Sequence, residues 1–343
     1  MRRAGLVVIA GLMMLMGVAC GGDDADAGSG DAGDEATTLT VYSGREEEYV
    51  EDLFERFTED TGIELDVRYG DSAELAGTLL EEGDSTPADV FFSQDAGSLG
   101  AVAEGGLFGD IPDDLLERVD PRFRSDDGLW VGTSGRARVA AFNTEVLEDS
   151  DLPDSIQGFT DPKWKGRIGF PPTNSSFQAF VAAMILTEGE EETRSFLEGL
   201  MANEPKSFED NGATTRAIAA GEIDVGFVNH YYIYEVAAED GEIPVENHFF
   251  TGGDAGALVN TAGVGLLSAG DQEAAAEFVD YLTGEEGQTY FPETVWEYPV
   301  VDGYEPSEDL PPLAEIESPD IDLSDLGGTL EPALTMLSEV GAL

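Results

Sequence analysis

From residue 39 onward, the apolar residues of this chain alternate between two spacings. Residues 39–43 and 88–92 are short apolar runs typical of buried strands, whereas 47–61 places Val50, Leu53 and Phe57 on one face of a helix. Strands and helices that alternate in this way predict an α/β fold, with a parallel sheet covered by helices on both faces. The further predicted strands are 63–69, 168–170, 223–228 and 263–267, and the further predicted helices are 72–82, 95–104, 177–187, 190–202, 213–220, 231–238, 272–282 and one from about residue 330.

The middle of the chain is less regular. Residues 130–142 contain strand-like runs that the segment 133–136 is expected to break, and 303–325 is loop-rich and acidic. In parallel α/β sheets, ligands bind beyond the carboxyl ends of the strands. Two predicted strands end in polar residues, at 43–46 and 93–95, so these two loops are candidates for a binding site.

The N-terminus has the features of an export signal. A basic start precedes an apolar stretch, 6–19, which is too short to span a membrane and ends in small residues before Cys20. We expect residues 1–19 to be a signal peptide and Cys20 to be lipidated after cleavage, with a plain secretory signal as the alternative. Residues 20–37, mostly Gly, Ala and Asp, predict a flexible acidic tether. Because Cys20 is the only cysteine, the exported domain has no disulfide and no thiolate metal site.

The net charge of the chain is its most unusual bulk property. Against 16 Lys and Arg it has 72 Asp and Glu, which gives −56 at neutral pH and argues against binding to nucleic acid phosphates. The acidic residues are spread over most of the predicted helices, which indicates a solvated acidic surface and not an acidic recognition tail. We interpret this surface as an adaptation to high ionic strength, where salt screens the self-repulsion. About 305 residues follow the tether, enough for two modest domains.

Two adjacent tyrosines, Tyr231 and Tyr232, are the strongest candidates for binding chemistry. A phenol in water ionises only near pH 10, but a small, highly charged cation can drive that ionisation. A pair of phenolates is a hard oxygen donor set, which suits ferric iron better than copper or zinc. The alternative is ordinary aromatic packing, because neighbouring residues on a strand point to opposite faces and could not hold one ion.

A junction between a strand and a helix would let both tyrosines reach one ion. Strand 223–228 is followed by Asn229, which we expect to be the N-cap of helix 231–238. The tyrosines would then lie on the first helical turn, where free backbone N–H groups favour an anion. The two histidines, His230 and His248, are expected to make structural contacts, so a histidine-based zinc or manganese site is not expected.

Several short phrases occur in a specific order along the chain. They are Leu-Thr-Val-Tyr-Ser-Gly at 39–44, Pro-Ala-Asp-Val-Phe-Phe-Ser at 87–93, Ser-Gly-Arg-Ala-Arg-Val at 134–139, Asp-Pro-Lys-Trp-Lys-Gly-Arg-Ile-Gly at 161–169, Asn-His-Tyr-Tyr at 229–232, Asp-Ala-Gly-Ala-Leu-Val at 254–259 and Trp-Glu-Tyr-Pro at 296–299. Together they resemble the ferric-iron substrate-binding proteins of bacterial ABC importers, the transferrin-like ferric-binding family. The resemblance covers nearly the whole chain after the tether.

The resemblance implies an α/β fold of the periplasmic-binding-protein type II, with two lobes hinged around a cleft. It places the first lobe at 39–135 plus about 262–310, and the second at about 136–261 plus about 311–343. It also implies that the protein is not an enzyme but captures ferric iron and delivers it to an ABC permease and its ATPase subunit. The chain would be a monomer, exported and held at the outer face of the cytoplasmic membrane through Cys20.

In this family, tyrosines and a small synergistic anion hold the iron. The resemblance therefore implies Tyr231 and Tyr232 as ligands of Fe³⁺, with carbonate or phosphate as the anion. Arg136 lies where some members use an arginine to bind carbonate. The remaining positions that match anion-contacting residues are Asn174, Ser175, Ser176, Asn211 and Asn229. The Asn174-Ser175-Ser176 run also opens a predicted helix, where it could serve as an anion cradle or as a simple N-cap.

The first lobe departs from the family pattern. Glu46 stands where some members have a histidine ligand, and Gln94 stands where they have a glutamate, with Asp95 next to it. The first lobe could therefore contribute a carboxylate from Glu46 or Asp95, a water, an anion, or nothing.

Two rival functions are set against iron capture. The same fold also carries organic cations and other small solutes, such as polyamines, thiamine, phosphonates and sugars, and Tyr231 could stack on a cation. An enzymatic function lacks support, because the chain has no Gly-x-Ser-x-Gly elbow, no P-loop and no cysteine nucleophile in its exported part.

Overall fold

A computed structural model describes residues 37–307 and 309–343, which are organised around one mixed sheet. The predicted signal peptide, Cys20 and all of the tether but Thr37 lie outside these residues. The strands follow the order β2-β1-β3-β9-β4-β7-β5-β6, and β8 pairs with β4. Their bounds are β1 (Thr38–Ser43), β2 (Glu64–Tyr69), β3 (Val90–Ser93), β4 (Trp130–Asn143), β5 (Ile168–Phe170), β6 (Lys206–Ser207), β7 (Val225–Asn229), β8 (Val245–His248) and β9 (Val259–Leu266).

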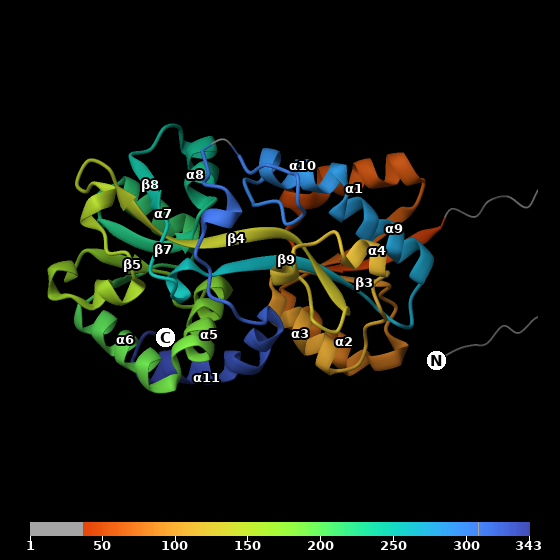
Figure 1. The fold of residues 1–343 in the computed structure, drawn as a ribbon, viewed down its shortest axis with the longest axis horizontal. Helices are drawn as coiled ribbons and strands as arrows, with labels where there is room; N and C mark the ends of the chain where they lie inside the picture. The colour runs from red at the N-terminus through yellow and green to blue at the C-terminus, as the bar shows by residue number, and fades with distance from the viewer. Residues whose placement is uncertain (1–36, 308) are drawn as a thin grey trace, which may run out of the picture. The chain divides into compact units, whose positions relative to one another are not determined.

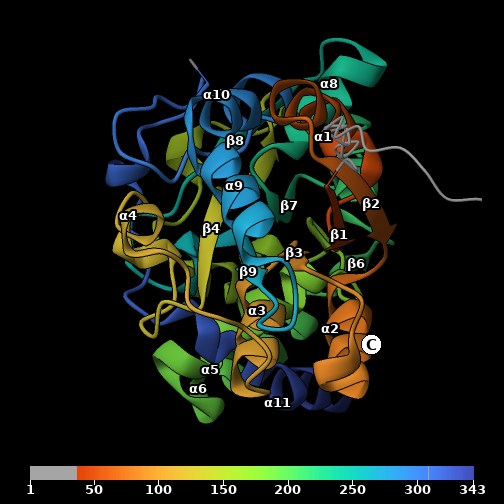
Figure 2. The ribbon, with the colours of Figure 1, turned by 90° about the vertical axis from the view of Figure 1, so that its right-hand side faces the viewer.

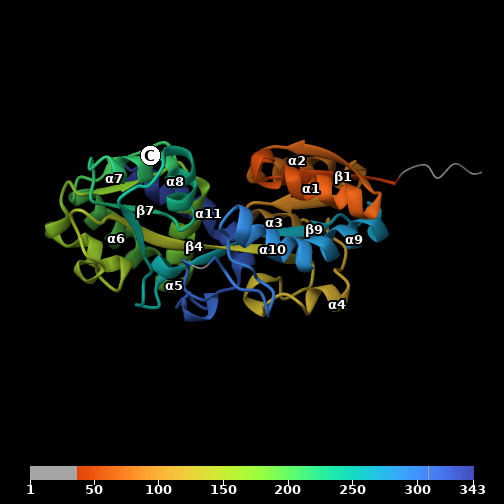
Figure 3. The ribbon, with the colours of Figure 1, turned by 90° about the horizontal axis from the view of Figure 1, so that it is seen from above.

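The sheet has two halves that β4 joins. In the first half-sheet (β1, β2, β3 and β9), β4 pairs with β9 through Ala137, and in the second half-sheet (β5, β6, β7 and β8), β4 pairs with β7 from Arg138 onward. Figure 3 shows β4 running from the one half toward the other. Residues at the crossing point, Arg136 to Arg138, therefore lie between the two halves.

Helices cover both faces of each half-sheet, as the sequence predicts. In Figures 1 and 2, α1 and α10 lie on one side of the first half-sheet and α2 and α3 on the other, while α7 and α8 face α5, α6 and α11 across the second half-sheet. The helices are α1 (Glu47–Thr61), α2 (Ser72–Glu82), α3 (Ala96–Glu104), α4 (Asp113–Leu116), α5 (Ser175–Glu188), α6 (Glu190–Ala202), α7 (Asn211–Ala219), α8 (Tyr232–Asp240), α9 (Gln272–Thr283), α10 (Glu285–Thr294) and α11 (Leu326–Glu339). Among these described helices, none is long and apolar enough to cross a membrane.

Two expectations about the sheet are wrong. The sheet is not wholly parallel, because β9 runs antiparallel to β3 and β4, and β4 runs antiparallel to β7 and β8. Nor does 133–136 break the strand: β4 is continuous, with only a shift of register between Gly132 and Ser134. The polar and small residues there have the composition of a turn. In the structure they pair with β9, and Gly135 also pairs with Tyr298, so their backbone hydrogen bonds are satisfied and the residues are buried.

The last helix contacts both parts of the molecule. α11 packs against α3 beside the first half-sheet and against α5 beside the second. The approach to α3 is close, since a Cβ added at Gly327 would lie 2.7 Å from the carbonyl oxygen of Gly97. The lobe boundaries at 135, 262 and 311 stay predictions, because α11 contacts helices beside both half-sheets and so does not show where one lobe ends.

Candidate functional site

The tyrosine pair lies at the predicted junction between a strand and a helix. β7 ends at Asn229, and Tyr231 occupies the N-cap position of α8 without a side-chain capping bond. The expectation that Asn229 caps this helix is wrong. The His230 backbone N–H still donates to the Ala137 carbonyl at 3.0 Å, which extends the strand pairing and moves the N-cap two residues along, to Tyr231.

The two rings share one wall of a cleft. Their centroids are 4.4 Å apart with a 28° angle between the planes, and both side chains line a cleft of about 780 Å³ between the half-sheets. Burial raises the pKa of Tyr231 above its usual value, although Arg136 opposes that rise, and burial raises the pKa of Tyr232 further. Both phenols are therefore neutral at physiological pH, and only a cation of high charge would ionise them.

His230 fixes the junction between β7 and α8 through hydrogen bonds made by both of its ring nitrogens. Its Nδ1 accepts from the Ala137 N–H at 3.1 Å, so the proton is on Nε2, which donates to the Trp296 carbonyl at 2.8 Å. Burial lowers the pKa of His230 to about 4, which keeps the ring neutral. Both nitrogens are used, as expected for a structural histidine. His248 likewise contacts Asp149 and the Pro153 carbonyl.

Two buried arginines lie at the crossing point of β4: Arg136 lines the cleft, and both line a smaller pocket that adjoins it. Arg136, 5% exposed, makes no side-chain hydrogen bond or ion pair to any described residue, and its Nε is buried without a partner. Arg138, 3% exposed, donates to Ser176 at 3.0 Å, to Asn229 at 3.1 Å and to the Phe227 carbonyl at 2.8 Å. Burial lowers the pKa of Arg138 to about 9, so the group is still charged at neutral pH. A positive charge without a carboxylate partner is costly to bury, which favours an anion beside these arginines.

The polar run at the start of α5 lies next to these arginines. Asn174 is the N-cap, accepting from the Ser176 N–H at 3.0 Å and from its hydroxyl at 2.6 Å. Asn211 donates to Asn174 at 3.1 Å and to Ser176 at 3.2 Å, while its Oδ1 is buried without a partner in the described structure. Ser175, at the exposed first position of α5, lines the same cleft. The run can therefore cap α5 and also face an anion, and all the predicted anion-contacting residues line the same cleft.

The three first-lobe candidates differ in how free their side chains are. Asp95 caps α3, accepting from the Ser98 N–H at 2.8 Å and from its hydroxyl at 3.0 Å. Glu46 precedes α1 but makes no capping bond, is exposed, and lines the cleft together with the tyrosines. Gln94 also lines the cleft, with its Oε1 buried and unpartnered among the described residues. Of these two first-lobe carboxylates, only Glu46 accepts no hydrogen bond from a backbone or hydroxyl donor of a described residue, and partial burial together with Glu48 raises its pKa.

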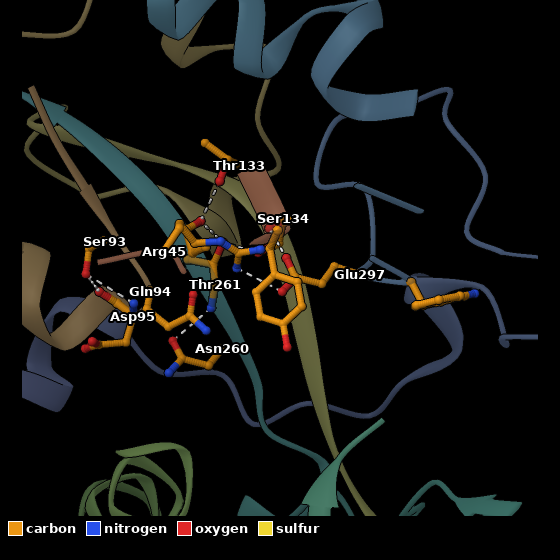
Figure 4. Close-up of polar contacts among 12 residues, drawn as sticks. Arg45, Ser93, Gln94, Asp95, Thr133, Ser134, Asn260, Thr261 and Glu297 are labelled. Carbon is orange, nitrogen blue, oxygen red and sulfur yellow. Dashed lines mark hydrogen bonds and ion pairs between the residues drawn. The ribbon is translucent and has the colours of Figure 1, made fainter. Parts of the chain in front are cut away.

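The sequence reasoning missed a buried polar cluster behind the cleft. Arg45 Nη1 pairs with Glu297 Oε1 at 2.8 Å, and the Ser134 hydroxyl donates to Glu297 Oε2 at 2.5 Å (Figure 4). Burial by itself would raise the pKa of Glu297, but the neighbouring positive charges of Arg45 and Arg136 bring that pKa below its usual value. Arg138 was also missed, although residues two apart on a strand share a face, so that Arg136 could have indicated it.

The donor set is oxygen from phenols, not a cluster of the usual metal ligands. Among the described residues no three His, Cys, Asp or Glu side chains come together as a metal site. Tyr231 and Tyr232 add two phenol oxygens to the lining of this cleft, and phenolate oxygens are donors that suit a ferric ion.

Comparison with known proteins indicates the family of this chain. A family model described as bacterial extracellular solute-binding protein matches residues 85–322. The Fe(3+)-binding periplasmic protein of Serratia marcescens is 31% identical over 323 residues, covering 93% of this chain and 93% of that protein. Iron-bound HitA from Pseudomonas aeruginosa is 34% identical with a TM-score of 0.82, over 89% of this chain and 99% of that one. A Trichodesmium protein, IdiA (FutA), solved with iron and citrate, is 29% identical with a TM-score of 0.79, over the same shares.

The fold and the cleft define a solute-binding protein and not an enzyme. The chain belongs to the bacterial extracellular solute-binding protein family, and ferric-binding proteins are among its relatives. The resemblance seen in the sequence and the predicted α/β fold of type II are thereby confirmed.

Proposed function

We propose that this protein captures ferric iron in the cleft, together with a small anion, and delivers it to an ABC permease. The observation that carries the proposal is that Tyr231 and Tyr232 line one cleft with Arg136, a buried guanidinium that has no partner among the described residues. The proteins from Serratia and Pseudomonas named above, described as iron-binding and iron-bound, support the same ligand for this chain.

Charge accounting supports a ferric ion with an anion. Two phenolates leave one positive charge on Fe³⁺, and the Glu46 carboxylate would neutralise it. An added carbonate or phosphate would then bring negative charge that only Arg136, Arg138 and the N-terminus of α5 can offset. The citrate found with iron in the Trichodesmium protein shows that a carboxylate anion accompanies iron in that relative.

The remaining parts of the proposal concern the setting of the site. We place the protein outside the cytoplasm, tethered through a lipidated Cys20 and acting as a monomer with a permease and its ATPase subunit. The lobes would be 39–135 plus about 262–310 and about 136–261 plus about 311–343. Iron bound at the tyrosines would draw the lobes together and exclude water from the cleft.

A visible absorption titration of metal-free protein with ferric citrate tests the function. The titration is run with carbonate, with phosphate, and with neither anion added. We expect a saturable charge-transfer band at one iron per chain, stronger with the anion that the cradle prefers. A folded protein that shows no band under any condition would exclude ferric iron, and calorimetry with spermidine and thiamine would then test the organic-cation alternative.

A pair of variants identifies the ligand from the first lobe. Glu46→Gln keeps the shape but removes the charge, and we expect it to weaken ferric binding by about tenfold to a hundredfold. Asp95→Asn is the matched control, because asparagine is an equally good N-cap for α3 and the side chain is already engaged with Ser98. Affinities are measured by competition with a chelator. An unchanged Glu46→Gln affinity beside a weakened Asp95→Asn would reverse the assignment.

A further inference from the structure

Three consecutive residues, Trp296 to Tyr298, connect the surroundings of the two proposed ligand groups. The Glu297 carboxylate pairs with Arg45, the residue before Glu46. The Trp296 carbonyl accepts from His230, the residue before Tyr231. This segment therefore lies between the first-lobe carboxylate and the tyrosine junction, with one contact to a neighbour of each.

The same segment is fixed to the strand that crosses between the half-sheets. Gly135 and Tyr298 exchange two backbone hydrogen bonds, of 2.7 and 2.9 Å. The Ser134 hydroxyl donates to the second oxygen of Glu297, as Figure 4 shows. A change in the angle at which β4 crosses between the half-sheets would therefore move the Glu297 carboxylate.

The backbone of the segment is held in a strained conformation. Trp296 has φ of 55°, in the left-handed region that bulky residues rarely adopt. Its ring stacks on Tyr234 of α8, with centroids 6.2 Å apart and planes at 17°. A conformation of this kind persists only where the surroundings impose it, and such residues concentrate at functional sites.

The ion pair within the segment is almost fully buried. Arg45 is 1% and Glu297 2% exposed, and the Nε and Nη2 of Arg45 have no partner in the described structure. A buried pair of this kind adds little net stability compared with apolar residues of the same size, and its best-supported use is to fix one arrangement. Stability alone therefore does not account for it.

We propose that Glu297 is a positioning residue of the iron site: through Arg45 it sets the place of Glu46, and through Trp296 and His230 it sets the place of Tyr231. This inference rests on the proposed function. Glu297 would not touch the metal, but it would fix the distance between a ligand from the first half-sheet and a ligand from the second.

The test is a double variant, Arg45→Gln with Glu297→Gln, which removes both charges of the pair together, so that neither partner is left behind as an unpaired buried ion. We expect a folded protein whose tyrosinate–iron band is shifted in wavelength and whose iron is lost to a chelator about tenfold faster. The matched control is Arg167→Gln with Asp224→Asn, which removes an ion pair with a 2.5 Å contact in the second half-sheet, away from the cleft. The control is expected to keep the wild-type band and release rate.

Ser134→Ala provides a second, milder variant in case the double variant does not fold. It removes only the hydroxyl bond to Glu297 and keeps the ion pair, and we expect a smaller change in the same direction. A wild-type band and release rate in every variant that folds would overturn the positioning role while leaving iron capture intact. Absence of the band in the wild-type protein would instead remove the proposed function, so the two failures are distinguishable.

Discussion

Tyr232→Phe, and separately Tyr231→Phe, should abolish most of the visible iron band and weaken ferric binding by at least roughly a hundredfold. That factor is the upper end of the loss seen when a residue that merely orients a ligand is removed, and here an anionic ligand itself is lost. The remaining phenolate would leave the ferric charge less compensated beside the buried guanidinium groups of Arg136 and Arg138. Absorption titration and chelator competition measure the two effects.

The fold should survive both substitutions. Neither phenol hydroxyl forms a hydrogen bond with a described residue outside the pair, so phenylalanine leaves no partner unsatisfied. Tyr234→Phe is the matched control, because it lies on the same helix and, among the described residues, its hydroxyl donates only to the Asp309 carbonyl, at 3.4 Å. If Tyr232→Phe kept the full band and affinity while remaining folded, Tyr232 would not be a ligand and the paired-phenolate model would fail.

The local parts of the structure could be predicted from the sequence, and the long-range parts could not. The helix predicted at 47–61 is α1 because its apolar residues share one face, and the tyrosine junction follows from a strand run that meets a helical run. By contrast, Thr133, Ser134 and Gly135 have the composition of a turn, and only pairing with β9 and Tyr298 makes them a strand.

The missed site residues have the same origin. Glu297 meets Arg45 across 252 positions of the chain, and Arg138 meets Asn229 across 91. No local pattern encodes these pairings, because they depend on how the halves of the sheet are brought together. The two-residue spacing from Arg136 could have indicated Arg138 as a site residue, but not its partner. The misplaced helix start is a smaller case of the same effect: Asn229 is a good N-cap residue, but its side chain accepts from Arg138 instead.

The second large effect is expected from salt. We expect the thermal unfolding midpoint to rise by roughly 10 °C between about 0.1 M and 1 M NaCl, where the Debye length falls from about 10 Å to 3 Å. The physical cause is the net charge of −56, which destabilises the compact state through self-repulsion until salt screens it. An equal concentration of a neutral osmolyte serves as the control, because it adds no screening.

One helix shows where this repulsion is concentrated. Along α1, four exposed glutamates follow one another at spacings of four residues, so like charges face each other turn after turn: Glu47, Glu51, Glu55 and Glu59. Each such pair costs about 0.2–0.5 kcal/mol, or about 1 kcal/mol for the row.

Replacing all four by glutamine should raise the midpoint in low salt and reduce its dependence on salt. A wild-type midpoint that does not respond to salt would mean that the acidic surface is not what limits stability at low ionic strength. A variant with the wild-type slope would mean that the α1 row does not contribute to the salt dependence. Because screening acts on the whole surface but glutamine only on this row, the variant should retain most of the slope and lose only the share that α1 contributes.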